Sequence, residues 1–321
     1  MRSKYINVFT EGDGITEHFL IENKNLATAR NGKPYINLTL RDKTGTISAK
    51  VWDDADLIFK QITSSQFVEV SGLVESFQGK PQLKVISIKS LKPEKIDMGD
   101  FIASTTKDIE KTFKELTDLC STVKDGNLKG LLDAFFADID FVARFKKSPA
   151  AKSIHHTYIG GLLEHTLSIM QICDKLAVHF GGINRDLLLT GAFFHDIGKI
   201  YELQTATTFD YTTEGSLIGH VVIGYQMVQM AISKIKDFPD KLRIELGHLI
   251  LSHQGKLEFG APVVPKCAEA LILHYADDCD VRINIFKRAI ESAKGTDSDF
   301  TDHMWELGGR VYRGVTQEIE E

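Results

Sequence analysis

The sequence predicts a multidomain protein in which an all-β barrel is followed by an all-α domain. Two observations favour this fold class. Up to residue 91, apolar and polar residues alternate with a period of two, which is typical of half-buried strands. Beyond residue 91, apolar residues recur at intervals of three and four, which is typical of amphipathic helices. We therefore expect a first domain over residues 1–91, a helical connector over 92–148 and a second domain over 149–321.

The first 91 residues contain strand patterns separated by turns. Ile36, Leu38 and Leu40 share one face of a strand, and the turn Asp42-Lys43-Thr44-Gly45 follows them. The predicted strands include 35–40, 47–51, 66–77 and 82–91, and a short helix fits 53–62. Five strands with a helix after the third describe an OB-fold.

The second and third strands of this barrel carry side chains suited to nucleic acid. Their outward side presents Tyr35, Asn37, Lys50 and Trp52. Two aromatic rings beside a cation and an amide can stack bases and contact phosphates without distinguishing sequences. The region also resembles the nucleic-acid-binding OB modules, in which we expect this face to bind. The alternative is that Trp52 only covers the helix that follows it.

The connector, residues 92–148, shows two apolar stripes. Lys92-Pro93-Glu94-Lys95 ends the barrel, and Gly126 separates the stripes. The stripes consist of Ile109, Phe113, Leu116 and Cys120, and of Leu128, Leu131, Leu132, Phe135 and Phe136. No residue here points to chemistry, so we expect helices that pack on the next domain. The same stripes would equally suit self-association, which makes a homo-oligomer an open alternative.

The second domain, residues 149–321, centres on Gly-Ala-Phe-Phe-His-Asp-Ile-Gly-Lys at 191–199. Neighbouring helical side chains point ~100° apart. His195 and Asp196 can therefore reach one point only if a small, strongly attracting object such as a metal ion lies between them. Imidazole nitrogen and carboxylate oxygen suit divalent ions. The alternative is a buried, hydrogen-bonded His-Asp pair in an ordinary core.

Further ligand candidates lie at the ends or edges of apolar helical patterns. His165 shares a face with Leu162 and Ile169. The remaining candidates are His220, His253 and Asp277, with Asp278 as the rival of Asp277. A single such histidine is more often an ordinary core residue. Four histidines and two aspartates in one segment favour a shared metal site.

These candidates resemble the H…HD…D signature of the HD superfamily of metal-dependent phosphohydrolases, formed here by His165, His195, Asp196 and Asp277. His220 and His253 are similar to the extra histidines of its two-metal members. The resemblance implies an all-α HD-type phosphohydrolase domain with two divalent ions. Asp196 is the natural bridge between them, because a carboxylate offers two oxygens.

The mixed nitrogen and oxygen ligands favour Mn²⁺, with Zn²⁺, Fe²⁺, Co²⁺ and Mg²⁺ as alternatives. Asp196 is expected to act in catalysis by holding the metal ions. Lys199 lies one turn beyond Asp196 and is expected to neutralise the negative charge that develops on the phosphate. An exposed lysine at a helix end is the alternative for Lys199.

The surrounding motifs are similar to the YhaM-type 3′-to-5′ exoribonucleases. They include Ile154-His155-His156, the segment 160–166, and Ser252-His253-Gln254-Gly255, where Gln254 stands in place of a family histidine. The resemblance implies a metal-dependent enzyme that releases nucleoside monophosphates from single-stranded RNA and, as an extension, single-stranded DNA. It also implies a catalytic contact to phosphate from His156.

Two other classes of function remain open from the residues alone. One is an HD-type nucleotide phosphatase or cyclic-nucleotide phosphodiesterase with a regulatory OB domain. The other is a non-catalytic binding protein with structural metals. The intact ligand set argues against the second class, and the barrel argues against the first.

The composition sets limits on partners and compartment. The net charge is −6, but residues 1–90 carry 12 Lys and Arg against 10 Asp and Glu, whereas the rest carries 26 against 34. Nucleic-acid binding must therefore be local, or helped by metal ions. Four scattered cysteines, the lack of an apolar leader, and the lack of ~18 successive apolar residues favour a cytoplasmic protein without membrane contact. We also expect a last helix over 304–311.

Overall fold

The computed structural model describes residues 4–29, 31–62, 66–92, 96, 98–101, 104–151, 158–205, 209–293, 298–304 and 307–314. The chain divides into two compact units. One comprises Met1–Ser104 with Ala206–Thr208, and the other comprises Thr105–Thr205 with Phe209–Glu321. The first unit is built mainly of strands and the second mainly of helices, as the sequence predicts.

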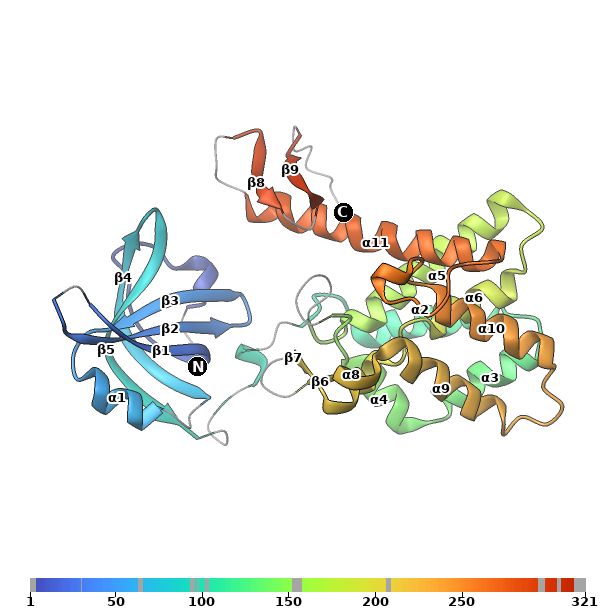
Figure 1. Ribbon diagram of the computed structural model, residues 1–321, viewed down its shortest axis with the longest axis horizontal. Coiled ribbons are helices and arrows are strands. Elements are labelled where there is room, and N and C mark those ends of the chain that lie inside the picture. Colours follow the sequence, from blue (N-terminus) through green and yellow to red (C-terminus); the bar gives the residue numbers. More distant parts are fainter. Residues whose placement is uncertain are drawn as a thin grey trace. The chain divides into compact units, whose positions relative to one another are not determined.

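Within the described residues, the first unit is a closed barrel with the strand order β1-β2-β3-β5-β4 (Figure 1). Neighbouring strands are antiparallel except for β3 and β5, which are parallel. The helix α1 (Ala55–Ile62) follows β3 in the chain, which confirms the OB-fold prediction. The strands are β1 (Gly14–Thr28), β2 (Pro34–Asp42), β3 (Gly45–Val51), β4 (Phe67–Phe77) and β5 (Lys80–Leu91).

The barrel core follows from the alternation in β2 and β3. Ile36, Leu38 and Leu40 are at most 2% exposed, and Leu38 is paired with the buried Ala49 of β3. Because successive strand residues point to opposite faces, the intervening residues of β2 and β3 lie on the outer face of the barrel. A Cβ on Gly72 would lie 2.4 Å from the backbone oxygen of Lys84, so the close approach of β4 to β5 requires glycine.

The second unit is helical and carries small antiparallel hairpins, β6–β7 and β8–β9. Asp108, Asp125 and Asp138 accept hydrogen bonds from the first-turn N–H groups of α2, α3 and α4, and such caps stabilise a helix by ~1 kcal/mol. The elements are α2 (Ile109–Ser121), α3 (Gly126–Phe136), α4 (Ile139–Lys147), α5 (Gly161–Phe180), α6 (Arg185–Phe194), α7 (Lys199–Glu202), β6 (Leu203–Thr205), β7 (Phe209–Tyr211), α8 (Thr213–Ile218), α9 (His220–Ile232), α10 (Asp240–Ser252), the 3₁₀ turn η4 (Leu257–Phe259), α11 (Ala268–Ser292), β8 (Phe300–Met304) and β9 (Gly309–Tyr312).

The helices share a hydrophobic core that also includes residues of α2, α3 and α4. Leu116, Leu163 and Leu249 from α2, α5 and α10 are at most 1% exposed. A Cβ on Gly191 of α6 would lie 2.4 Å from a side-chain carbon of Leu249. Glycine at 191 therefore lets α6 and α10 pack closely, which brings the C-terminal ends of these two helices together.

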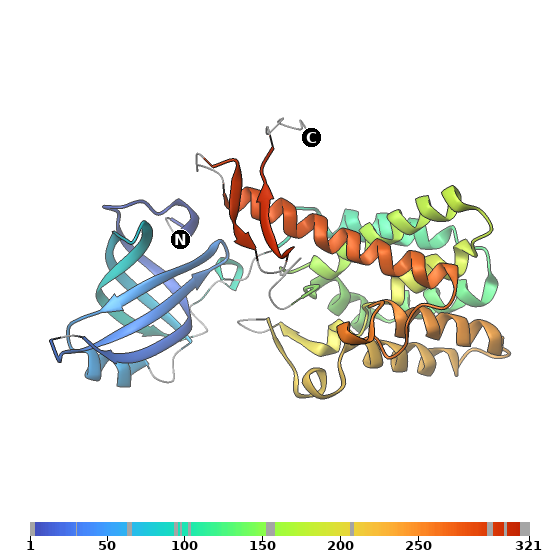
Figure 2. The same ribbon diagram turned by 45° about the horizontal axis from the view of Figure 1, so that its top comes forward.

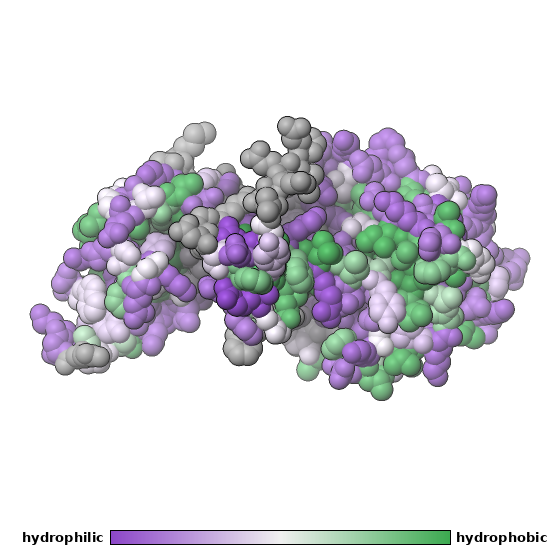
Figure 3. All heavy atoms as spheres, turned by 90° about the horizontal axis from the view of Figure 1, so that it is seen from above, coloured by the Kyte–Doolittle hydropathy of each residue, from purple (hydrophilic) through white to green (hydrophobic). Residues whose placement is uncertain are grey.

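The long helix α11 lies across the helical unit, and the hairpin β8–β9 packs near its C-terminal end (Figure 2). Leu271, Tyr275, Ile283 and Phe286 of α11 are exposed. The face of this unit seen in Figure 3 mixes apolar with polar side chains. Among the described residues, no helix combines the length and the apolar character that crossing a membrane requires.

The predicted helix over 304–311 is wrong. Phe300–Met304 and Gly309–Tyr312 instead form the hairpin β8–β9. Thr301 and Val311 are 4% and 3% exposed, so one β-branched residue from each strand lies on the buried side of the hairpin. Gly308 has a φ of 68°, a left-handed turn conformation that interrupts a helix and suits glycine.

Candidate metal centre

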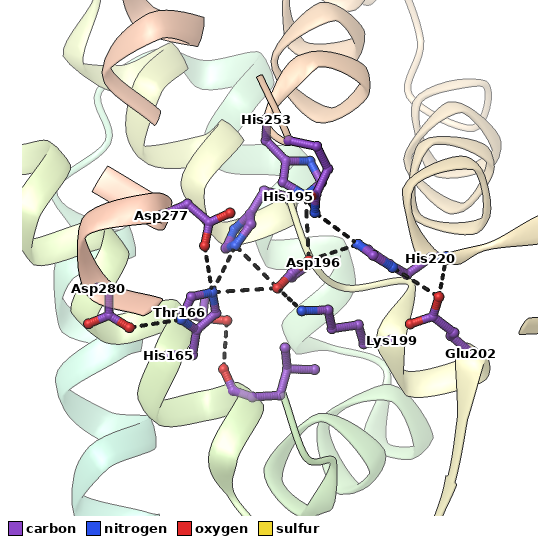
Figure 4. Close-up of polar contacts among 12 residues, drawn as sticks. His165, Thr166, His195, Asp196, Lys199, Glu202, His220, His253, Asp277 and Asp280 are labelled. Atoms are coloured by element: carbon purple, nitrogen blue, oxygen red, sulfur yellow. Dashed lines mark hydrogen bonds and ion pairs between the residues drawn. The ribbon is translucent and has the colours of Figure 1, made fainter. Parts of the chain in front are cut away.

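His165 lies on the buried side of α5 and is fully shielded from solvent. Its Nδ1 lies 3.0 Å from Oδ2 of Asp280 on α11. A carboxylate can only accept a hydrogen bond, so Nδ1 carries the proton in this contact. Nε2 is thereby directed at the cluster of side chains between the helices (Figure 4).

His195 and His253 occupy equivalent positions at two helix ends. His195 directly follows α6, and His253 directly follows α10. Each donates Nδ1–H over 2.7 Å to the carbonyl oxygen three residues earlier, that of Ala192 or Ile250. The last carbonyls of a helix have no N–H partner within the helix, so the imidazole satisfies one of them. Both Nε2 atoms are left with their lone pairs for another partner.

The first group of candidate ligands combines His165, His195 and Asp277. Nε2 of His165 lies 3.2 Å from Nε2 of His195 and 3.2 Å from Oδ1 of Asp277. Oδ2 of Asp196 lies 3.5 Å and 3.4 Å from the two Nε2 atoms. Ligand atoms that share one divalent ion at ~2.1 Å and ~90–110° lie ~3.0–3.4 Å apart. The group has the spacing of a single coordination sphere.

The second group combines Asp196, His220 and His253. Oδ1 of Asp196 lies 3.3 Å from Nε2 of His220 and 3.6 Å from Nε2 of His253. His220 is the first residue of α9, and its Nδ1 lies 3.0 Å from Oε1 of Glu202. The same oxygen accepts the backbone N–H of His220. Asp196 therefore faces the first group with Oδ2 and the second group with Oδ1.

These contacts fit a cation better than a hydrogen-bonded core. Oδ1 of Asp196 is buried and has no hydrogen-bond donor among the described residues. The imidazoles that face it, those of His220 and His253, use Nδ1 as the donor to other oxygens. A carboxylate oxygen opposite two nitrogen lone pairs is repulsive unless a positive charge lies between them. The donor set of this centre therefore fits divalent metal ions.

The electrostatics of the centre favour positive charge. Burial opposes ionisation of Asp196, but Lys199 and His195 beside it hold the pKa of its carboxyl well below the usual range. Burial would lower the pKa of His165, whereas hydrogen bonds with Asp196, Asp277 and Asp280 raise this pKa well above its ordinary value. The carboxylates thus stabilise a cation, whether proton or metal, among the ligand atoms.

Lys199 is buried, not exposed at a helix end. It is 8% exposed, and its Nζ donates to Oδ2 of Asp196 over 2.6 Å. Burial would lower the pKa of this ammonium, but the carboxylate of Asp196 raises it above its usual value. Lys199 also lines a cavity of about 160 Å³ together with His253 and Asp277. A positive charge held on Asp196 therefore lines the same cavity as two of the metal-ligand candidates.

The four residues predicted to bind nucleic acid lie together on the barrel. Tyr35 and Trp52 are stacked, with ring centroids 4.7 Å apart and an interplanar angle of 22°. Nζ of Lys50 lies 5.6 Å and 5.5 Å from the two ring centroids. Asn37 is paired with Lys50 across β2 and β3. Phe77 of β4 is 51% exposed and lies 5.0 Å from the same ammonium, so the patch also includes a third aromatic ring.

Comparisons with known proteins agree with both units. The HD domain model matches residues 162–282, and the OB-fold nucleic acid binding domain model matches residues 20–91. The 3′-5′ exoribonuclease YhaM of Oceanobacillus iheyensis is 32% identical over 94% of this chain and 94% of its own length. The 3′-5′ exoribonuclease YhaM of Bacillus subtilis is 31% identical over 97% of this chain and 98% of its own. The chain belongs to the YhaM family of 3′-5′ exoribonucleases.

In this YhaM-family chain, the HD domain implies a divalent metal, and the predicted ligand residues lie in adjoining groups. Asp277 and Asp278, the alternative candidates for one ligand position, have different partners in the structure. Oδ1 of Asp277 lies in the first group, whereas Asp278 accepts hydrogen bonds from Arg282 at 2.7 Å and 2.9 Å. Gln254 reaches the second group, with Nε2 2.9 Å from Nε2 of His253. His156 lies outside the described residues.

Sequence reasoning missed two carboxylates that orient the histidines. Asp280 accepts from His165, and Glu202 accepts from His220. Both are 8% exposed. In metal sites such carboxylates fix the tautomer and orientation of a ligating imidazole. Asp280 stands three residues beyond Asp277 on α11, so helical spacing could have drawn attention to it, but nothing in the sequence links Glu202 with His220.

Proposed function

We propose that this chain is a metal-dependent 3′-to-5′ exoribonuclease that releases nucleoside monophosphates from single-stranded RNA, with single-stranded DNA as a further substrate to be tested. The observation that carries the proposal is the carboxylate of Asp196, whose two oxygens face two groups of imidazole nitrogens. The membership of the YhaM family and the OB-fold barrel support RNA as the substrate.

The ligand assignment follows the two groups. His165, His195 and Asp277 would hold one ion, His220 and His253 would hold the other, and Asp196 would contact both. Mn²⁺ suits this mixture of nitrogen and oxygen donors, with Zn²⁺, Fe²⁺, Co²⁺ and Mg²⁺ as competitors. Bound ions at such a site would lower the pKa of a water nucleophile and neutralise the oxygens of the scissile phosphate.

The protein itself supplies position and charge. Lys199 is anchored on Asp196 and lines the cavity, so its ammonium would attract the phosphate and stabilise negative charge that develops there. His156 is proposed as a further phosphate contact on the family resemblance alone. In this proposal, the domain over 1–91 binds the RNA strand and the domain over 149–321 hydrolyses it. The connector over 92–148 packs on the hydrolytic domain.

On the barrel, Tyr35, Trp52, Asn37 and Lys50 are proposed to hold the single strand. The stacked rings would take bases, and the ammonium and amide would contact the backbone. None of these contacts distinguishes one base from another, which suits an enzyme that shortens strands of any sequence. A cytoplasmic location and self-association through apolar helix faces belong to the same proposal.

The deciding experiment replaces Asp196 with alanine and follows RNA that carries a label at its 5′ end. Asp196→Ala removes the contact to both ions, so metal content and hydrolysis should fall by orders of magnitude, while RNA affinity stays unchanged because the barrel is intact. The matched control is Asp240→Ala, because the carboxylate of Asp240 is exposed, pairs with Arg243 and does not line the cavity beside the candidate centre. Wild-type protein should shorten the strand progressively from the 3′ end, and exhaustive chelation should stop it.

Other outcomes would change the conclusion. An Asp196→Ala protein with full metal content and activity would show that the His-Asp pair is only a core feature. A wild type that ignores RNA but cleaves free or cyclic nucleotides would favour an HD-type nucleotide phosphatase or phosphodiesterase with a regulatory barrel.

A further inference from the structure

The cavity beside the candidate metal centre has an aromatic wall that the ligand assignment does not use. The cavity is lined by the ligand candidates His253 and Asp277, and its other lining residues include Phe259 and His274. Its volume of about 160 Å³ is below the ~300–1,000 Å³ of pockets that enclose a whole drug-sized ligand. It therefore suits the end of a long substrate whose remainder stays outside.

Phe259 is displayed by a short turn with a defined backbone. The turn η4 follows His253 by a few residues, and Phe259 is 52% exposed. The backbone N–H groups of Phe259 and Ala261 both donate to the carbonyl oxygen of Lys256, over 3.0 Å and 3.2 Å. Gly260 then ends the turn with a φ of 92°, a left-handed conformation that glycine adopts without strain.

The start of this turn is fixed as well. Gly255 has a φ of 77°, and a Cβ there would lie 2.1 Å from the imidazole of His274. His274 in turn contacts the carbonyl oxygen of His253 through Nδ1 at 2.9 Å. The chain that leaves the metal-ligand candidate His253 is therefore held tightly up to η4. The position of the Phe259 ring relative to the metal centre is set by this backbone.

A cation accompanies the ring. Nζ of Lys256 lies 5.0 Å from the ring centroid of Phe259, within the range of a cation–π contact. The same ammonium lies 3.5 Å from Oε1 of Glu258, and the side chain of Lys256 is 59% exposed. An exposed, flexible lysine can keep to one face of the ring while a flat partner covers the other. An aromatic face beside a positive charge is the combination with which proteins bind single-stranded nucleic acid.

We infer that Phe259 is the stacking platform for the base of the 3′-terminal nucleotide, placed so that the adjoining phosphate reaches the metal centre. This inference rests on the proposed function, and it adds the subsite that positions the end of the strand. Every base has a π face, so the subsite accepts all four terminal nucleotides. Phe259 would act as a positioning residue, without a part in bond cleavage.

The test combines a protein change with a substrate change. Two short 5′-labelled RNAs are compared, one intact and one whose 3′-terminal residue lacks its base. The measured quantity is the single-turnover rate of removal of that residue at subsaturating enzyme. With the intact strand, Phe259→Ala should lower this rate about 5- to 150-fold, the range expected for one base-stacking contact. Wild-type protein should lose a similar factor on the abasic strand, and Phe259→Ala should lose nothing more there.

Matched variants separate stacking from folding. Phe259→Trp should restore the rate on the intact strand because it offers a larger ring. Leu257→Ala is the control, since Leu257 is 65% exposed in the same turn but does not line the cavity. Metal content, measured by elemental analysis, should equal that of wild type in all three variants.

Equal losses for Phe259→Ala on the intact and abasic strands would overturn the inference, as would a loss of metal in this variant. In either case normal wild-type digestion would leave the proposed function standing. A wild type that removes no residue from either strand would overturn the proposed function and the subsite together.

Discussion

Replacing Asp280 with alanine should weaken metal binding although this residue is not among the proposed ligands. Its Oδ2 accepts from Nδ1 of His165 over 3.0 Å, and its Oδ1 accepts from Ser168 over 2.5 Å. Removing the carboxylate leaves the buried imidazole without the acceptor that fixes its tautomer. Losing such an orienting partner typically costs 10–100-fold in metal affinity, which is about 1.4–2.7 kcal/mol.

The assay is a calorimetric titration of metal-free protein with Mn²⁺, with circular dichroism as the check on folding. Asp278→Ala on the same helix is the matched control. Its carboxylate is 38% exposed and pairs with Arg282, and exposed pairs contribute only ~0–1 kcal/mol to stability. An Asp280→Ala protein that binds Mn²⁺ with wild-type affinity would refute the argument that this carboxylate orients a metal ligand.

Two further predictions test the aromatic face of the barrel and the role of Gln254 beside the second group of candidate ligands. Replacing Tyr35 and Trp52 with alanine should weaken RNA binding by ~1–3 kcal/mol per lost stacked base, measured by fluorescence anisotropy. Hydrolysis of a small chromogenic phosphodiester should persist. If a folded variant loses RNA binding and this hydrolysis together, the two rings have a structural role and do not form a binding face. Gln254→His should tighten Zn²⁺ binding at least ~10-fold relative to Mn²⁺, because an imidazole replaces an amide near His253 and His220. Unchanged metal competition would place Gln254 outside the coordination sphere.

The barrel could be predicted where the side-chain alternation is strict. Residues Ile36, Leu38 and Leu40 alternate without interruption, and the structure buries all of them. The first strand lacked such a signal because β1 has an irregularity between Ile21 and Asn23, where its register with β2 shifts. An irregularity of this kind moves the apolar positions to the other face, so the period of two is lost. Local pattern therefore predicted the fold but not the extent of its longest strand.

The candidate ligands could be predicted because each lies at the end or edge of an apolar helical pattern. The choice between Asp277 and Asp278 could not, since neighbouring positions on a helix differ by only ~100° and both follow the same apolar residues. The structure separates them by partners: Asp277 meets His165, and Asp278 meets Arg282. The role of Glu202 could not be predicted from the sequence for another reason. Its contact with His220 depends on how the chain returns after α7, which no local periodicity records.

The positions of His195 and His253 place the candidate metal centre between two helix ends. Each helix end carries partial negative charge from its unpaired carbonyl groups, and one of these carbonyls orients each imidazole. The close packing of α6 on α10 at Gly191 brings the two ends together. Asp196 and Asp277 add full negative charges to the same point.

This concentration of negative charge also bears on the substrate. Residues 91–321, which include the helical unit, carry 34 acidic against 26 basic side chains, so this part of the chain repels a polyanion. Lys199 offsets only part of this charge, because its ammonium is already paired with Asp196. Bound divalent ions would reverse the sign of the local field at the point where the phosphate must arrive. We therefore expect bound metal ions to assist the approach of the RNA strand to the HD domain as well as its hydrolysis, and we expect the barrel to bind RNA without them.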